Sequence, residues 1–299
     1  MMFKFRVHRW FRALLVVSTA FTFDWGASAQ GIVDSATHVS PARTGSTASP
    51  QVTVLPTQLT IPELNRERTI RIYVPPGYAR SDRRYPVLYM HDGQNLFDDT
   101  TAYAGEWGVD ETLDRLALSQ ALELIVVGID NGGNRRMTEL NAWDNTRFGK
   151  GEGKAYMDFI VNVVKPMVDA NYRTLPDRKN TGVMGSSMGG LISHYAILQY
   201  PHVFGKAGII SPSYWVGPEI FDMTATRPPA SDARLAVYMG GGEGDQAVDD
   251  FHRMVAQLQS QAHPKSRLWV KLAPNALHNE AAWRAEFASV VGWMYAPDE

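Results

Sequence analysis

Short apolar runs recur along this chain and restrict its possible folds more than any other feature. Residues 86–90 (PVLYM) and 124–129 (LIVVGI) carry no charged side chain. A strand without polar positions has both faces covered, which is typical of a parallel sheet flanked by helices. Further expected strands cover residues 181–185, 207–210, 235–239 and 268–272. We therefore predict a mostly parallel central sheet.

Amphipathic stretches alternate with these runs. Apolar residues recur at helical spacing in three of them: Val109, Leu113, Leu116 and Ala117; Tyr156, Ile160, Val163 and Met167; and Trp283, Phe287, Val290 and Met294. Residues 69–74 (TIRIYV) instead alternate with period two, which predicts a half-exposed antiparallel strand. The pattern predicts one doubly wound α/β domain, with antiparallel N-terminal strands and helices on both faces of the sheet.

The first 29 residues have the pattern of an export signal. Basic side chains near the start are followed by an apolar run at residues 13–23 and by the small residues Ala27-Ser28-Ala29. This order predicts a signal peptide at residues 1–29 and an exported protein, periplasmic or secreted. An uncleaved membrane anchor is the alternative, but the apolar run is shorter than the ~20 residues that span a bilayer. Residues 30–50 are expected to be a flexible lead-in to a single domain at residues 51–299.

Composition excludes several classes of site. The 299 residues include no cysteine, which excludes disulfides, thiolate metal sites and cysteine nucleophiles. A formal net charge of −2 gives no electrostatic reason to expect nucleic acid as a partner. No apolar run after residue 29 is long enough to span a bilayer, so no stable membrane insertion is expected after signal cleavage.

The segment GVMGSSMGG at residues 182–190 contains the pattern G-x-S-x-G, with Ser187 at its centre. It follows a short apolar strand and precedes a helical stretch. A strand that turns at once into a helix strains the serine backbone, and the residues two positions away must lack side chains to avoid collision. A glycine-rich packing turn is the plainer alternative. The context favours Ser187 as a nucleophile over its neighbour Ser186, which has no flanking glycine pair.

A serine hydroxyl needs a base to act at neutral pH, and in this arrangement the chain order is serine, acid, histidine. Five histidines follow Ser187. Four lie within a helix, at a helix end or before a strand, whereas His278 directly follows the last expected strand. A loop at the carboxyl end of a strand brings its side chains over the sheet edge. We therefore expect His278 to be the base; the alternative is that it is an ordinary surface residue.

The acid is expected after the preceding strand. Residues 240–246 (GGGEGDQ) offer Glu243 and Asp245, and either can orient an imidazole and stabilise its protonated form. We prefer Glu243 and keep Asp245 as the alternative. The negative charge of an acyl-transfer transition state needs two backbone donors. We assign these to the amides of Met188, after the nucleophile, and of Gln94, after residues 86–90.

A metal pair is the alternative interpretation of His91-Asp92. No third ligand lies at metal-site spacing, and the sequence has no H-E-x-x-H segment. We therefore expect neither a metal nor an organic cofactor.

Five segments together resemble the putative esterase family of α/β-hydrolases. They are VLYMHDGQNLFDD, IVVGIDNGGNRRMTEL, GVMGSSMGG, SPSYW and HNEAAW. The family includes esterase D-like enzymes, feruloyl and acetylxylan esterases, siderophore esterases and mycolyltransferases. The resemblance extends from about residue 53 to the carboxyl terminus. It implies an α/β-hydrolase catalytic domain with Ser187 as nucleophile, His278 as base and Glu243 as acid, and Gln94 and Met188 as oxyanion donors.

Large aromatic side chains are expected near Ser187. Trp107, Trp143 and Trp215 fall in loops that converge on this edge of the sheet, where an aromatic face can stack on a phenolic acyl group or a sugar ring. Capping of the core is the alternative for these residues. Arg135 and Arg136, with Glu139, can recognise an anionic substrate or brace their loop, and we favour bracing.

These inferences combine into an exported serine carboxylesterase that works through an acyl-enzyme. Its substrate is expected to be a small-molecule or saccharide-linked ester, such as an aryl, feruloyl, acetyl-sugar or siderophore ester. Two alternatives stay open: an acyltransferase that uses the same nucleophile, and a catalytically silent ligand-binding homologue.

Overall fold

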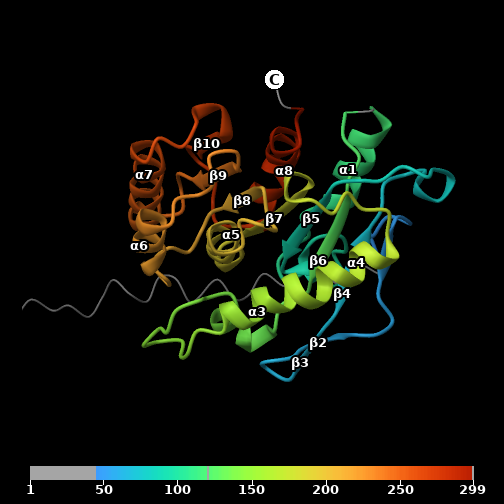
Figure 1. The fold of residues 1–299 in the computed structure, drawn as a ribbon, viewed down its shortest axis with the longest axis horizontal. Helices are drawn as coiled ribbons and strands as arrows, with labels where there is room; N and C mark the ends of the chain where they lie inside the picture. Colours follow the sequence, from blue (N-terminus) through green and yellow to red (C-terminus); the bar gives the residue numbers. More distant parts are fainter. Residues whose placement is uncertain (1–44, 120, 298–299) are drawn as a thin grey trace, which may run out of the picture. The chain divides into compact units, whose positions relative to one another are not determined.

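The computed structural model describes residues 45–119 and 121–297. The predicted signal peptide and most of the predicted lead-in lie outside these residues and stay predictions. The described residues contain an eight-stranded sheet and a separate two-stranded one (Figure 1). In spatial order the large sheet comprises β1 (Val52–Val54), β4 (Ile70–Tyr73), β6 (Ile125–Ile129), β5 (Val87–His91), β7 (Thr181–Ser186), β8 (Lys206–Ile210), β9 (Arg234–Gly240) and β10 (Leu268–Ala273). The small sheet pairs β2 (Leu59–Ile61) with β3 (Arg66–Arg68).

Pairing in the large sheet is parallel from β6 to β10, and β1 and β4 join its edge antiparallel. The predicted mostly parallel sheet with antiparallel N-terminal strands is therefore confirmed. Two apolar cores lie on opposite faces of this sheet because successive strand residues point to opposite sides. Val87 and Tyr89 belong to one core, and Leu88 and Met90 to the other.

Helices cover both faces, as predicted. The core that contains Leu88 is closed by α1 (Val109–Leu118) and α8 (Glu280–Met294). The other core is closed by α3 (Gly153–Phe159), α4 (Lys165–Asn171), α5 (Met188–Gln199), α6 (Glu219–Thr226) and α7 (Asp245–Ser260). A short helix, α2 (Arg136–Glu139), follows β6.

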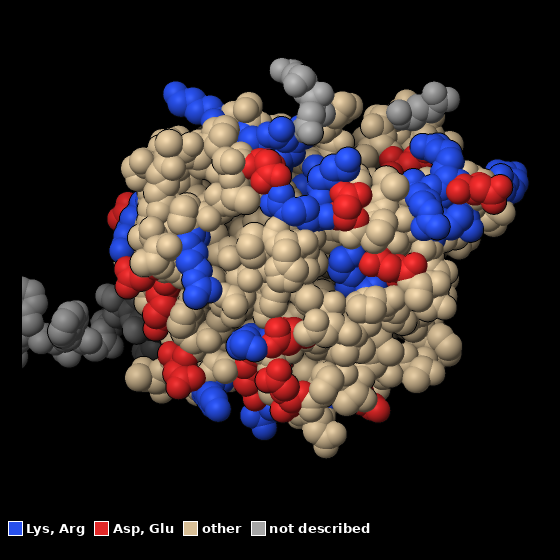
Figure 2. Space-filling model, viewed as in Figure 1, with Lys and Arg blue, Asp and Glu red and all other residues tan. Residues whose placement is uncertain are grey.

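Two surface properties of the described part bear on its surroundings. None of its helices combines the length and apolarity that crossing a bilayer requires. Figure 2 shows basic and acidic side chains interspersed over one face, beside uncharged ones. Such mixing of signs agrees with the small net charge of the sequence.

The prediction of a half-exposed strand at residues 69–74 is wrong, because β4 is buried along its whole length. Arg71 points to the side expected to face solvent but is only 9% exposed. Its guanidinium donates to both carboxylate oxygens of Asp130, over 2.8 and 3.0 Å. The polar position Arg71 in this pattern is thus covered through a half-buried ion pair.

The helical face predicted from Tyr156 to Met167 is correct only in its first half. Tyr156 and Ile160 are buried, but after them Val164 and Val168 take the buried positions. The cause is a π-helical turn at Ile160–Val164, which inserts one residue and rotates the following face.

Candidate active site

The predicted catalytic residues follow strands that end at the same edge of the sheet. Ser187 follows β7, Glu243 follows β9 and His278 follows β10. These strands are parallel, so their carboxyl ends lie on the same side (Figure 1). The loop after β5, which carries Gln94, reaches this edge as well.

Backbone strain marks Ser187. Its φ is 59° and its ψ −119°, in a region that non-glycine residues rarely adopt. A Cβ at Gly185 would lie 2.9 Å from the backbone of Gly189, and one at Gly190 would lie 2.6 Å from the carbonyl oxygen of Ile210. These glycines allow strand, turn and helix to approach closely. The predicted strand–turn–helix is therefore present, with Ser187 at its apex.

His278 and Glu243 are in direct contact. The Nδ1 atom of His278 lies 2.7 Å from Oε2 of Glu243. The Glu243 side chain is only 1% exposed, whereas that of His278 is 42% exposed. A buried carboxylate at Nδ1 orients the imidazole and leaves Nε2 for proton transfer.

Asp245, the alternative acid, lies elsewhere. It is exposed and begins α7, where a carboxylate interacts favourably with the amino end of the helix. Between the two acids considered, the geometry therefore favours Glu243.

The segment after β8 connects the nucleophile with the acid. The Ser187 amide donates to the carbonyl of Ile210, and the Ser213 amide donates to the carbonyl of Ser187, both over 3.0 Å. The Ser187 and Ser213 hydroxyls lie 3.1 Å apart. Ser211, between these contacts, donates its hydroxyl to Glu243 over 2.6 Å. The four residues 210–213 thus contact both the Ser187 turn and Glu243.

The two predicted oxyanion donors lie in different secondary structures. Met188 is the first residue of α5, and amides in the first turn of a helix have no partner within the helix. Gln94 lies in a short 3-10 turn at Gly93–Asn95, which follows Asp92 with φ at 56°. In this turn Asp92, and not Gly93, adopts the left-handed conformation. Gly93 is needed because a Cβ there would lie 2.8 Å from the β6 backbone.

Asp92 anchors the loop after β5, which carries Gln94. It is 6% exposed and accepts hydrogen bonds from Arg136 Nε at 2.7 Å, Arg136 Nη2 at 2.9 Å and Asn131 Nδ2 at 2.6 Å. Burial alone would raise the pKa of this carboxyl, but Arg136 and the Asn131 hydrogen bond lower it below its usual value. Of the two arginines for which we favoured bracing of the loop, Arg135 and Arg136, it is Arg136 that pairs with Asp92. Glu139 instead pairs with Arg66 and Arg68.

His91 is engaged inside the protein. Its Nδ1 lies 2.8 Å from the Tyr156 hydroxyl, and burial lowers its pKa to about 4. Since Asp92 is occupied by Arg136 and Asn131, these two side chains already use polar atoms that a metal pair would require.

The three tryptophans assigned to the substrate pocket differ in their surroundings. Trp107 is only 3% exposed and packs against Trp283 and Phe287, so it takes the core-capping role. Trp143 is half-buried against Tyr195. Trp215 is 50% exposed, and its ring centroid lies 6.0 Å from that of Phe148. Trp215 therefore offers an accessible aromatic face two residues after Ser213.

Sequence reasoning missed Glu280, two residues after His278. It is 8% exposed in the first turn of α8, and burial raises the pKa of its carboxyl, with Asp92 adding to the effect. The available signal in the sequence was its position at the start of the last expected helix, two residues after the predicted base.

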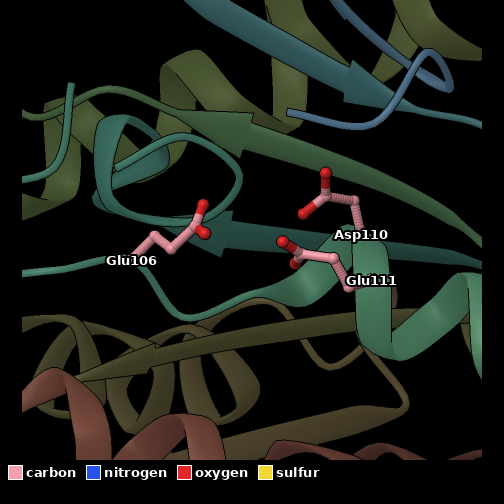
Figure 3. Close-up of side chains that lie close together, drawn as sticks. All are labelled: Glu106, Asp110 and Glu111. Carbon is pink, nitrogen blue, oxygen red and sulfur yellow. The ribbon is translucent and has the colours of Figure 1, made fainter. Parts of the chain in front are cut away.

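A second group of acidic side chains lies apart from the Ser187 turn. Within the described residues, Glu106, Asp110 and Glu111 bring one carboxylate oxygen each within 4.8 Å of one another, and Figure 3 shows the three side chains converging. Their number and type can suit a hard cation. Glu106 also lies 3.8 Å from Arg284, and Asp110 accepts a hydrogen bond from the Ser49 amide.

Asp110 is expected to lower the stability of the protein progressively as pH rises from about 4 to about 7, and Asp110→Asn should remove this contribution. Burial raises the pKa of Asp110 to about 7. The folded state therefore keeps a proton that the unfolded state releases near its ordinary pKa, and the folded state loses this advantage as pH rises. Thermal unfolding at a series of pH values measures the effect.

At pH 8 the D110N protein should unfold at a higher temperature than the wild type, since the amide carries no charge to bury. Asp245→Asn is the matched control, because Asp245 also lies in the first turn of a helix but is exposed. Parallel pH curves for the wild type and D110N would contradict the prediction.

Comparison with known proteins identifies relatives in sequence. A model of the family described as "Putative esterase" matches residues 61–294. The uncharacterized protein YbbA of Bacillus subtilis (strain 168) is 28% identical over 245 residues, which cover 76% of this chain and 92% of that protein. The endo-1,4-beta-xylanase/feruloyl esterase of Xylanibacter ruminicola is 26% identical over 164 residues, covering 54% of this chain but only 22% of that protein.

Solved structures share the fold. A ferulic acid esterase superposes with a TM-score of 0.64 at 18% identity, covering 82% of this chain and 98% of that one. Enterochelin esterase from Shigella flexneri superposes with a TM-score of 0.68 at 20% identity, covering 84% of this chain and 59% of that one. At these identities the likeness establishes a common α/β-hydrolase-type fold, which confirms the predicted fold class.

Proposed function

This chain belongs to the putative esterase family and is a carboxylic ester hydrolase, and we propose that it works through Ser187, His278 and Glu243. The observation that carries the proposal is the 2.7 Å contact between His278 and Glu243. This contact lies at the sheet edge where Ser187 adopts its strained backbone. Nucleophile, acid and base follow one another along the chain in the order typical of α/β-hydrolases.

In the proposed reaction, His278 Nε2 removes the Ser187 proton while Oγ attacks the ester carbonyl carbon. The resulting oxyanion accepts hydrogen bonds from the amides of Met188 and Gln94. Glu243 stabilises the imidazolium that forms. Collapse of the intermediate breaks the bond to the alcohol, which leaves with the proton from His278. A water molecule, deprotonated by His278, then attacks the acyl-enzyme; the acid leaves as the bond to Oγ breaks, and His278 returns the proton to Ser187 Oγ.

Covalent labelling tests this assignment. A fluorophosphonate should form one phosphonyl adduct, on the peptide that contains Ser187, because the probe reacts with an activated serine. Peptide mapping by mass spectrometry locates the adduct. An adduct on another residue, or none, would overturn the assignment.

The structure supports an ester with an aromatic or other planar acyl group. Exposed Trp215 packs edge to face against half-buried Phe148, and the hydroxyl of Ser213, two residues before Trp215, lies 3.1 Å from that of Ser187. An aromatic acyl chain can stack on this pair while its carbonyl reaches the nucleophile. The names of similar proteins, which include feruloyl and siderophore esterases, agree with substrates of this size.

Trp215→Ala is therefore expected to raise KM for methyl ferulate by about three- to tenfold, the equivalent of one aromatic contact. KM for a short acetyl ester should stay within about twofold, since its acyl group is too small to reach the ring. Steady-state kinetics with both substrates measures the difference. Equal changes for the two esters would show that Trp215 does not select the acyl group.

Export belongs to the proposal as well. The basic start, apolar run and small residues of positions 1–29 support removal of a signal peptide, which would make Gln30 the first residue of the mature chain.

A further inference from the structure

The carboxylate of Glu243 is held by separate partners on its two oxygens. Oε2 lies against His278, while Oε1 accepts hydrogen bonds from the Ser211 hydroxyl at 2.6 Å and from the Gly240 amide at 2.9 Å. A carboxylate with one restrained oxygen rotates easily about its terminal torsion, which has a broad minimum. The two donors at Oε1 remove this freedom, so Oε2 keeps facing the imidazole.

Ser211 makes this contact from a buried position with a strained backbone. It is 1% exposed and its φ is 44°, a left-handed conformation that costs free energy for a residue with a Cβ. Its amide donates to the carbonyl of Tyr238 over 2.8 Å. The surrounding backbone therefore holds Ser211 in an unfavourable conformation whose hydroxyl reaches Glu243.

Trp283 fixes the direction of the hydrogen bonds. Its indole Nε1 lies 2.9 Å from the Ser211 hydroxyl oxygen, and an indole nitrogen is a donor only. The Ser211 oxygen therefore accepts from Trp283, and its own proton is directed to Glu243. The chain runs from indole N–H to hydroxyl to carboxylate, and each bond polarises the next.

Trp283 also restrains the base directly. Its ring packs edge to face against His278, with centroids 5.0 Å apart and planes at 87°. The Trp283 side chain is itself almost buried, and its ring lies 5.8 Å from that of Trp107. One rigid ring thus contacts the imidazole and, through Ser211, the acid.

We propose that Trp283 and Ser211 are positioning residues that hold Glu243 and His278 in the geometry needed for proton transfer from Ser187. This inference rests on the proposed function. Neither residue is assigned a contact with substrate, so their loss should lower kcat and leave KM unchanged. A role confined to core packing would lower the unfolding temperature without this split.

The hydrogen-bond chain from Trp283 through Ser211 to Glu243 is called the relay below. Trp283→Phe tests it because phenylalanine keeps an aromatic ring but lacks the N–H. We expect kcat for a p-nitrophenyl ester to fall by about tenfold, a part of the ~10²–10⁴-fold that acid–base catalysis supplies, with KM within about twofold. Ser211→Ala should lower kcat similarly. The double variant should lose little more than the S211A protein, since both residues act through one hydrogen-bond chain.

Proton NMR of the hydrogen bond between His278 and Glu243 gives a second test beside the rate. The proton shared by His278 Nδ1 and Glu243 should give a low-field proton NMR signal in the wild type, which Glu243→Gln removes. In the S211A and W283F proteins this signal should broaden or shift upfield. Trp293→Phe is the matched control, since Trp293 lies on the same helix and contacts Arg234; its kcat and the low-field signal should equal those of the wild type.

The outcomes separate this inference from the proposed function. If the wild type labels at Ser187 but both relay variants keep full kcat and the wild-type signal, the relay is wrong and the catalytic assignment stands. If Trp293→Phe lowers kcat as much as Trp283→Phe, the effect is general packing and the relay is also wrong. Absence of fluorophosphonate labelling in the wild type instead overturns the proposed function itself. Should the W283F protein fail to fold, the S211A protein carries the test.

Discussion

Ser187→Ala is expected to lower kcat for p-nitrophenyl acetate by about 10⁶-fold, the loss typical of removing the nucleophile of a serine hydrolase. Without Oγ no acyl-enzyme forms, and His278 and Glu243 have no proton to transfer. Fluorophosphonate labelling should disappear together with turnover. Steady-state hydrolysis and mass spectrometry measure the two effects.

The fold should tolerate this change. The described contact of the Ser187 hydroxyl is with Ser213 at 3.1 Å, and alanine also carries a Cβ, so the backbone strain at this position hardly changes. The unfolding temperature should therefore stay within a few degrees of the wild-type value. This separates loss of chemistry from loss of structure.

Ser186→Ala is the matched control, because the neighbouring serine is the rival nucleophile. Ser186 lies in β7 and is 5% exposed, and its replacement should leave labelling intact and hydrolysis within severalfold of the wild type. If the S187A protein kept more than a small fraction of wild-type turnover, the nucleophile would lie elsewhere. If the wild type neither labelled nor hydrolysed esters, the ligand-binding alternative would gain support.

The sequence allowed the position of the site to be predicted because its signals are local. Glycines two residues before and after Ser187, between a strand and a helix, permit the close contacts that a strained serine turn requires. His278 and Glu243 were selected by their places after successive strands. In a parallel sheet, place after a strand determines the edge on which a loop lies.

Other features depend on tertiary contacts that no local pattern encodes. The Asp92–Arg136 pair joins residues 44 positions apart, and the Trp283–Ser211 bond joins residues 72 apart. The burial of Arg71 in β4 depends on its ion pair with Asp130, and the π-turn after Phe159 shifts a helical face by one residue. Trp107 and Trp215 are both tryptophans in loops expected near Ser187. Trp107 is buried because it packs against Trp283 and Phe287 of α8, a contact that the local sequence does not indicate.

Arg136→Met is expected to have the second largest effect, because it leaves the carboxylate of Asp92 buried without its counter-ion. Breaking a buried ion pair on one side costs about 3–5 kcal/mol. For a domain of this size such a loss lowers the unfolding temperature by roughly 10 °C. Chemical and thermal unfolding monitored by circular dichroism measure this loss.

Catalysis should suffer as well. Asp92 begins the turn that carries Gln94, one of the proposed oxyanion donors, and its side chain is fixed by Arg136 and Asn131. Loss of one correctly placed oxyanion donor costs about 10²–10³-fold in kcat. We therefore expect kcat of the R136M protein to fall by about 10²-fold, measured well below its unfolding temperature.

The pair can be tested further by a double-mutant cycle and by pH. Asp92→Asn combined with Arg136→Met removes both charges and should recover part of the stability lost in the R136M protein, since no unpaired charge stays buried. Arg136→Lys keeps the positive charge but lacks the planar guanidinium, so its stability should lie between those of the wild type and the R136M protein.

The pair can also be tested by pH. Arg136 lowers the pKa of Asp92 in the folded protein, so the pair contributes stability above the pKa of Asp92 in the unfolded chain and loses it as pH falls. The stability difference between wild type and R136M should therefore shrink on acidification. A pH-independent difference, or no recovery in the double variant, would mean that Arg136 stabilises the loop by packing and not by charge.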